Sequence, residues 1–291
     1  MSLRLRGRSV PSAQELRGPR ADVDVELDLL LLKVAIAPTF IGLLSLIALR
    51  YGHRAAGWLV ALPVNTGSIL FVLSLTEGTT FAAHAALGAL LGIVSLSAFS
   101  IGYARSALRF PWPVCLAVAV AGFAVSTFVL TAAPELVALD LLAAVAAVAV
   151  VVAVLPSRSE PARPPAAPRW EIPLRMLTAA VLVVAITTAA GELGAQLSGL
   201  LSPVPVFTIT LVIFTHSREG PTPVLVFLAG LQYGLFSFAA FCATAAVLLV
   251  PDGIGVAIAG GLVAFLGVFA LLQFVLGRRV LGREDARDRA R

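Results

Sequence analysis

The sequence predicts an all-α protein, a polytopic transmembrane helical bundle of about nine spans arranged as an inverted internal repeat of four spans, one linking span and four spans. Three observations predict this class: an apolar composition, recurrent apolar stretches of membrane-crossing length, and a similarity between the two halves of the chain. Of the 291 residues, 59% are hydrophobic and 13% are charged, and the mean hydropathy is +0.98. Since a soluble domain carries about 25% charged residues, this composition cannot cover a surface that faces water, and soluble enzymes, nucleic-acid binders and disulfide-rich secreted domains are excluded.

Apolar stretches of about 20 residues, the length that crosses a bilayer, recur between short polar breaks. The predicted spans are 29–49, 56–76, 80–103, 112–132, 135–155, 173–191, 195–216, 222–249 and 254–277. The first is too long for the apolar part of a signal peptide. After the fifth span, the segment 156–171 holds five prolines and three arginines, which predicts an extended polar linker.

This pattern divides the chain into five parts. They are a polar tail (1–28), a first four-helix unit (29–132), a linker helix with the Pro/Arg-rich loop (133–171), a second four-helix unit (172–278) and a charged tail (279–291). On the predicted side that carries the C-terminus, 15 basic residues stand against six acidic ones, and the other side has six basic and ten acidic residues. Because Lys and Arg resist translocation, the C-terminus is predicted to be cytoplasmic, although the basic N-terminal tail leaves an even number of spans open.

A repeat is visible when the sequence is compared with itself at an offset of 142 residues. Between residues 62 and 102, 11 of 41 positions are identical, and the identities include Pro, Glu and Gly residues at the same spacing. Five spans separate equivalent points, so the two units are expected to lie in the membrane with opposite orientations, as in many secondary transporters. A duplicated scaffold without transport is the alternative.

Two basic and two acidic residues at equivalent positions are candidates for function. Lys33 and Arg175 lie inside or at the edge of a span, where an ionisable group is costly and often functional, although both can extend to the headgroups. Glu77 and Glu219 lie in very short turns and are interpreted first as helix-capping residues. The alternative is a gate or proton-linked carboxylate near Lys33 or Arg175.

Two equivalent prolines mark the predicted substrate pathway. Pro63 and Pro205 fall within the second and seventh spans, and broken helices at corresponding places in two halves point to a transporter's site. The polar residues expected to line the pathway are Asn65, Thr66, Thr208 and Gln232, with Lys33 and Arg175 attracting an anionic group. Alternatively, the hydroxyls merely satisfy the kinked backbone.

Glycines at helical spacing form a third set. Gly88 and Gly92, with their equivalents Gly230 and Gly234, predict close helix packing. Neither a nucleophile with a base, nor metal-ligand spacing, nor a phosphate-binding loop stands out, so we expect no enzyme activity, no cofactor and no metal.

The residues Lys33, Ala56-Gly57, Pro63 and Gly78 resemble in their spacing the GlpM family of small bacterial inner-membrane proteins. The resemblance covers about residues 30–105, with a fainter copy over 172–245, so the chain looks like a doubled member. It implies a bacterial inner-membrane protein with a link to the cell envelope. The overall layout is similar to that of drug and metabolite transporters.

The leading functional hypothesis is a small secondary transporter or flippase-like permease for a small metabolite or lipid-linked molecule. The alternative is a non-transporting accessory or assembly subunit of an envelope-polysaccharide or other membrane complex. The expected partners are the lipid bilayer, a small-molecule substrate and, in the second case, another membrane protein, but no nucleic acid.

Overall fold

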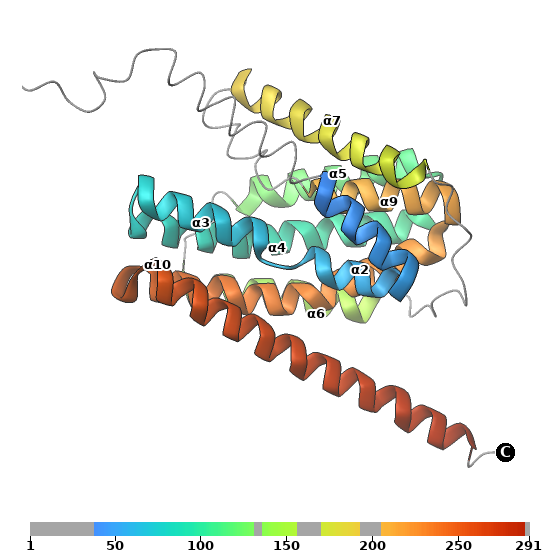
Figure 1. Cartoon of the computed structure of the whole chain (residues 1–291). Helices are drawn as coiled ribbons and strands as arrows, with labels where there is room; N and C mark the ends of the chain where they lie inside the picture. Colours follow the sequence, from blue (N-terminus) through green and yellow to red (C-terminus); the bar gives the residue numbers. More distant parts are fainter. Residues whose placement is uncertain (1–37, 131–135, 156–169, 193–204, 289–291) are drawn as a thin grey trace, which may run out of the picture.

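The computed structural model describes residues 38–130, 136–155, 170–192 and 205–288, and within these ranges every regular element is a helix (Figure 1). The helices are Pro38–Tyr51, α2 (His53–Val60), α3 (Val64–Thr76), α4 (Thr79–Ala107), α5 (Trp112–Leu130), α6 (Val137–Val154), α7 (Glu171–Glu192), α9 (Val206–Glu219) and α10 (Pro221–Asp288). They form a helical bundle, which confirms the all-α prediction.

Four of the described helices are long and apolar enough to cross a membrane: α4, α5, α6 and the part Pro221–Val275 of α10. The prediction of nine spans is thus larger than the number of helices that meet this criterion. One reason is proline, which lacks a backbone N–H and interrupts a helix. Pro63 lies between α2 and α3, and α9 begins only after Pro205, so the second and seventh predicted spans contain shorter helices.

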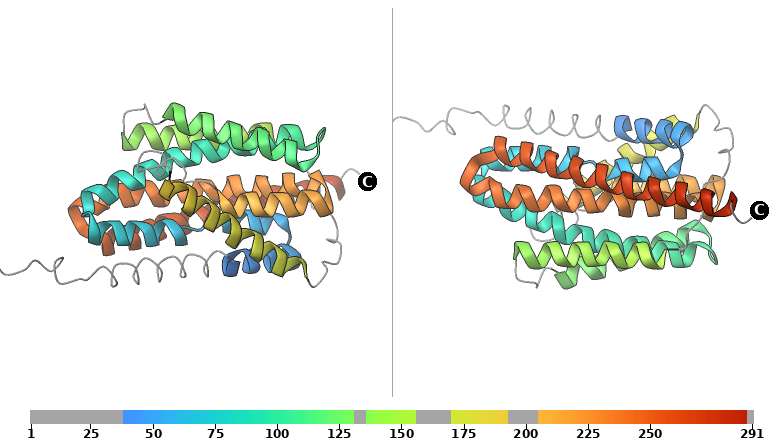
Figure 2. Two further views of the ribbon diagram at one scale, coloured as in Figure 1. Left: turned by 90° about the horizontal axis from the view of Figure 1, so that it is seen from above. Right: turned by 90° about the horizontal axis from the view of Figure 1, so that it is seen from below.

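The longest helix, α10, folds back on itself at Gly253, where φ is +79°. A straight helix over the 55 residues Pro221–Val275 would be about 80 Å long, far more than the hydrocarbon thickness of about 30 Å. The two arms run antiparallel (Figure 2), since Gly260 approaches Leu248 and Gly261 approaches Phe241 across the fold. The eighth and ninth predicted spans are therefore the arms of one hairpin.

Helices α5 and α6 lie at the periphery and expose apolar side chains, as expected for contact with lipid. In α5 the buried residues are Cys115, Ala119 and Phe123, which share one face, while Val118 and Val125 on other faces are exposed. A helix that is apolar on all faces but buried on only one suits a membrane and not water.

The centre of the bundle is the antiparallel contact of α4 with the first arm of α10. Ser97 and Ser100 of α4 contact Gln232 of α10, and Tyr103, further along α4, contacts His216 near the end of α9. The turn at Gly220 therefore lies beside the C-terminal end of α4.

Gly78 immediately precedes α4 and therefore lies at the other end of this 29-residue helix, which is about 43 Å long. We call the end that holds the Gly220 turn the Arg-rich end. It carries the exposed arginines Arg50, Arg54, Arg105, Arg109 and Arg218.

Helix α2 packs very closely on α10, through glycines on both helices. A Cβ added at Gly57 would lie 2.2 Å from the carbonyl oxygen of Phe227, and one added at Gly230 would lie 2.2 Å from the carbonyl oxygen of Arg54. Only residues without a side chain allow two backbones to approach so closely. This contact holds the start of α2 beside the end of α9.

Candidate functional site

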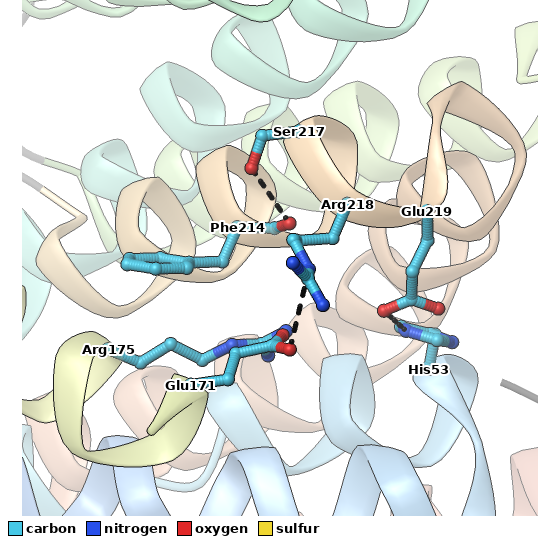
Figure 3. Close-up of polar contacts among 7 residues, drawn as sticks. All are labelled: His53, Glu171, Arg175, Phe214, Ser217, Arg218 and Glu219. Atoms are coloured by element: carbon cyan, nitrogen blue, oxygen red, sulfur yellow. Dashed lines mark hydrogen bonds and ion pairs between the residues drawn. The ribbon is translucent and has the colours of Figure 1, made fainter. Parts of the chain in front are cut away.

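Five ionisable side chains from three helices gather at the Arg-rich end (Figure 3). We call them the charged cluster: His53 from α2, Glu171 and Arg175 from α7, and Arg218 and Glu219 from α9. Because α2, α7 and α9 are separated in sequence, only the tertiary structure brings these residues together.

The centre of the charged cluster is the carboxylate of Glu171, which two guanidinium groups share. Its Oε1 accepts a hydrogen bond from Arg175, one helical turn later in α7, and its Oε2 lies 3.6 Å from Nε of Arg218. The side chains of Glu171 and Arg175 are 4% and 5% exposed, whereas that of Arg218 is 39% exposed. Glu171 and Arg175 are therefore buried with Arg218 at their surface, and these three residues together carry a formal charge of +1.

Each guanidinium also lies over an aromatic ring. Arg175 is 5.5 Å from the ring centroid of Phe214, and Arg218 is 5.5 Å from that of Trp170. The negative face of an aromatic ring attracts a cation, most strongly where water is excluded. These contacts hold both arginines in place beside Glu171.

The second pair in the charged cluster joins α2 to the end of α9. Nε2 of His53 lies 3.2 Å from Oε1 of Glu219, and the two side chains are only 5% and 8% exposed. Removing either partner would leave the other polar group buried without this hydrogen bond, which destabilises the fold. The pair therefore fixes the position of α2 relative to the Gly220 turn.

Two buried polar atoms of the charged cluster, Nε of Arg175 and Oε2 of Glu219, have no hydrogen-bond partner among the described residues. A buried donor or acceptor without a partner is unusual in a folded protein, and a ligand is one reason to retain it.

A second polar group lies midway along α4, in its contact with α10. Ser97 donates a hydrogen bond to Oε1 of Gln232, and Nε2 of Gln232 donates one to Oγ of Ser100. All three residues are at most 1% exposed. We call this group the polar clamp, because it joins the two long helices inside an otherwise apolar interface.

The predicted pathway residues do not form one cluster. Gln232 belongs to the polar clamp, whereas Asn65 and Thr66 lie in the first turn of α3 and Thr208 lies in the first turn of α9. Thr208 is buried and Thr66 is partly buried. Lys33 lies outside the described residues.

The predicted kink and gate residues lie at helix ends. Pro63 directly precedes α3 and Pro205 directly precedes α9, and each carbonyl accepts a hydrogen bond from the residue four positions later. Glu77 is exposed just after α3, whereas the side chain of Glu219 is only 8% exposed within the charged cluster. Arg175, expected to attract an anion, is bound to the chain's own Glu171.

The four glycines divide into two kinds. Gly230 and Gly234 pack against α2, and a Cβ at either would lie under 3 Å from that helix or the residue that follows it. A Cβ at Gly88 or Gly92 would meet no described atom within 4 Å. The same sequence motif thus makes a tight helix crossing in one half and an open surface in the other.

Sequence reasoning missed three members of the charged cluster. His53 and Arg218 were not selected as candidates, and Glu171 fell within the predicted polar linker 156–171. A local signal was present for Glu171, because Glu and Arg four residues apart form ion pairs in helices. Nothing in the sequence pointed to the pairing of His53 with Glu219, which are 166 positions apart.

The chain matches no family model, no curated protein and no solved structure. The class that the fold and composition indicate is an all-helical membrane protein.

Proposed function

We propose that this chain is a small secondary transporter or flippase-like permease built from two inverted units, which moves a small metabolite or lipid-linked molecule. We place it in a bacterial inner membrane, as a multi-pass protein with a cytoplasmic C-terminus. The observation that carries the proposal is the agreement between helix boundaries 142 residues apart.

The boundaries agree at three successive points. Helix α3 begins at Val64 and α9 at Val206; α4 begins at Thr79 and α10 at Pro221. Helices α4 and α10 each follow a glycine with a positive φ, which is +94° at Gly78 and +85° at Gly220. Further on, α5 begins at residue 112 and the second arm of α10 follows Gly253, at residue 254. Each pair of boundaries is 142 residues apart, which favours two repeated units with the same order of helices.

The directions of the helices favour opposite orientations of the two units. Helix α4 and its proposed equivalent, the first arm of α10, run antiparallel, and the Gly78 and Gly220 turns lie at opposite ends of the bundle. Transporters with inverted repeats use this relation to expose a central site to either side in turn. The polar clamp would then lie where the two units meet.

The two ends of the bundle differ in a way that suits alternating access. At the Arg-rich end, the charged cluster joins α2, α7 and α9. At the other end, Glu77, the equivalent of Glu219, is exposed. We interpret the structure as a state that is closed at the Arg-rich end, which the distribution of arginines predicts to be cytoplasmic.

The first experiment measures the sidedness of the two turns. A reporter active only in the cytoplasm and one active only outside are fused after Glu77 and after Glu219, and we expect opposite signals, with the Glu219 fusion cytoplasmic. Signals from the same side would remove the inverted arrangement.

Flux into vesicles reconstituted with the purified protein then tests transport itself, with a panel of labelled small anionic metabolites. We expect Arg175→Ala and Lys33→Ala to abolish flux without preventing membrane insertion. Arg109→Ala, which changes an exposed arginine at the same end, is the matched control and should retain flux. Unchanged flux in both test variants would exclude these residues from the mechanism.

An accessory or assembly subunit is the second candidate, favoured by the open surface at Gly88 and Gly92. Small residues that meet no atom of the described part of the chain suit a helix of a partner membrane protein. Gly88→Ile should then shrink the complex extracted from the native membrane, whereas Gly267→Ile, at an equally open site on α10, should not. An unchanged complex in both variants would count against this candidate.

A further inference from the structure

The arrangement around Glu171 has the composition of an anion-binding site that the chain's own carboxylate occupies. Two guanidiniums converge on one carboxylate, and an aromatic ring lies beside each. Guanidiniums bind carboxylates and phosphates through the same charge-assisted hydrogen bonds. Once Glu171 is displaced, Arg175 and Arg218 carry two positive charges against the single negative charge of Glu219, so the vacated position attracts an anion.

The hydrogen bonds of this group are incomplete. The two oxygens of Glu171 face Arg175 and Arg218, but Nε of Arg175 is buried and finds no acceptor in the described part of the chain. A carboxylate offers two oxygens, whereas a phosphate group offers three or four. A phosphate group therefore has an additional oxygen that can accept a hydrogen bond from Nε of Arg175.

Access to the site is through Arg218. Its side chain is 39% exposed, while those of Glu171 and Arg175 are nearly covered. An anion that arrives at the Arg-rich end therefore meets Arg218 first and Arg175 after Glu171 has moved away.

We infer that Arg175 and Arg218 form a binding site for an oxyanion, a phosphate group above all, and that Glu171 occupies this site in the absence of the ligand. Binding replaces Glu171 and thereby releases the start of α7 from α9. This inference deepens the proposed function. It rests on the proposed function only where it treats the bound anion as part of the transported molecule. The phosphate group belongs either to a soluble molecule or to a lipid headgroup.

The test measures binding without transport, on the full-length protein in detergent. Thermal unfolding is followed while inorganic phosphate replaces chloride at constant ionic strength. Glu171→Gln removes the competing charge and should lower the half-maximal phosphate concentration by about tenfold or more relative to wild type. Glu171→Gln combined with Arg218→Gln should lose the effect, and Asp252→Asn, which changes an exposed carboxylate beside the fold of α10 at Gly253, should behave as wild type.

Two lipid compositions distinguish the sources of the phosphate group. In nanodiscs of phosphatidylcholine, stabilisation of Glu171→Gln by free phosphate indicates a soluble ligand. Stabilisation by added phosphatidylglycerol but not by free phosphate indicates a lipid headgroup. If neither anion distinguishes Glu171→Gln from wild type, the inference is overturned.

Failure of the variant to fold is also informative. If Glu171→Gln can be purified in phosphate buffer but aggregates in chloride, the phosphate has taken the place of the missing carboxylate. If it aggregates in both, Glu171 is a structural ion-pair partner only and the inference fails. Binding without flux in the vesicle assay would contradict the proposed function and leave this site intact, so the two failures are distinguishable.

Discussion

The close crossing of α2 and α10 gives the sharpest prediction about stability. In Gly230→Ala the new Cβ would lie 2.2 Å from the carbonyl oxygen of Arg54 and 3.0 Å from its carbonyl carbon and Cα. These are backbone atoms, which cannot rotate away as a side chain does. Since non-bonded carbon contacts are favourable near 3.5–4.0 Å, the helices must separate by about 1 Å. Overpacking of this kind costs roughly 1–3 kcal/mol, and we expect a value near the upper limit.

The matched control is Gly88→Ala, the same change at the equivalent position of the other half. A Cβ there meets no described atom within 4 Å, and alanine favours a helix more than glycine does. Gly88→Ala should therefore be as stable as wild type or slightly more stable.

The assay is thermal unfolding with a dye that fluoresces on reacting with thiols. Cys115 and Cys242 are both 0% exposed and unpaired, so they react only when the bundle opens. A loss of 2–3 kcal/mol lowers the melting temperature by about 5–10 °C. Gly57→Ala, on the other side of the crossing, should cause a similar fall, and the double variant should lose less than the sum, because one separation relieves both contacts. Equal melting temperatures for Gly230→Ala and Gly88→Ala would refute the close crossing.

Two further predictions concern the polar clamp and the fold of α10. Ser97→Ala leaves Oε1 of Gln232 buried without its donor and should cost about 1–2 kcal/mol of stability. Adding Gln232→Leu to this variant removes the second partner and should recover most of the lost stability. Purely additive losses in the double-mutant cycle would argue against the hydrogen bond. Gly253→Ala places a side chain at a φ of +79° and should cost roughly 1–2 kcal/mol, while Gly255→Ala, where a Cβ meets nothing within 4 Å, should not destabilise. Equal melting temperatures for the two glycine variants would contradict the left-handed turn.

Local sequence predicted the all-helical class because the causes of helix formation are local. A stretch without charges must satisfy its own backbone hydrogen bonds in lipid, and a helix does so within one segment. Pro63 interrupts a helix through its own ring, and Gly78 and Gly220 allow the positive φ of their turns through the absence of a side chain. The number of helices long enough to cross a membrane was harder to predict from the sequence, because it depends on where each helix ends.

The candidate site was predicted only in part, because its contacts are distant in sequence. Arg175 and Glu219 were selected from their positions near span ends, but the partners Glu171 and His53 were not. A carboxylate beside a turn looks the same in sequence whether it faces water, as Glu77 does, or a buried histidine, as Glu219 does.

The sequence alone therefore determined the class: apolar composition and interrupted apolar stretches lead to an all-helical protein with exposed apolar faces. The tertiary structure decided which of two identical motifs is used. Gly88 and Gly230 have the same chemistry and spacing, yet only Gly230 faces another described helix at backbone contact distance. It also decided that Arg175 binds Glu171 and Arg218 lies beside both, because close packing of α7 on α9 is a property of the assembled bundle and leaves no periodic signal in either helix.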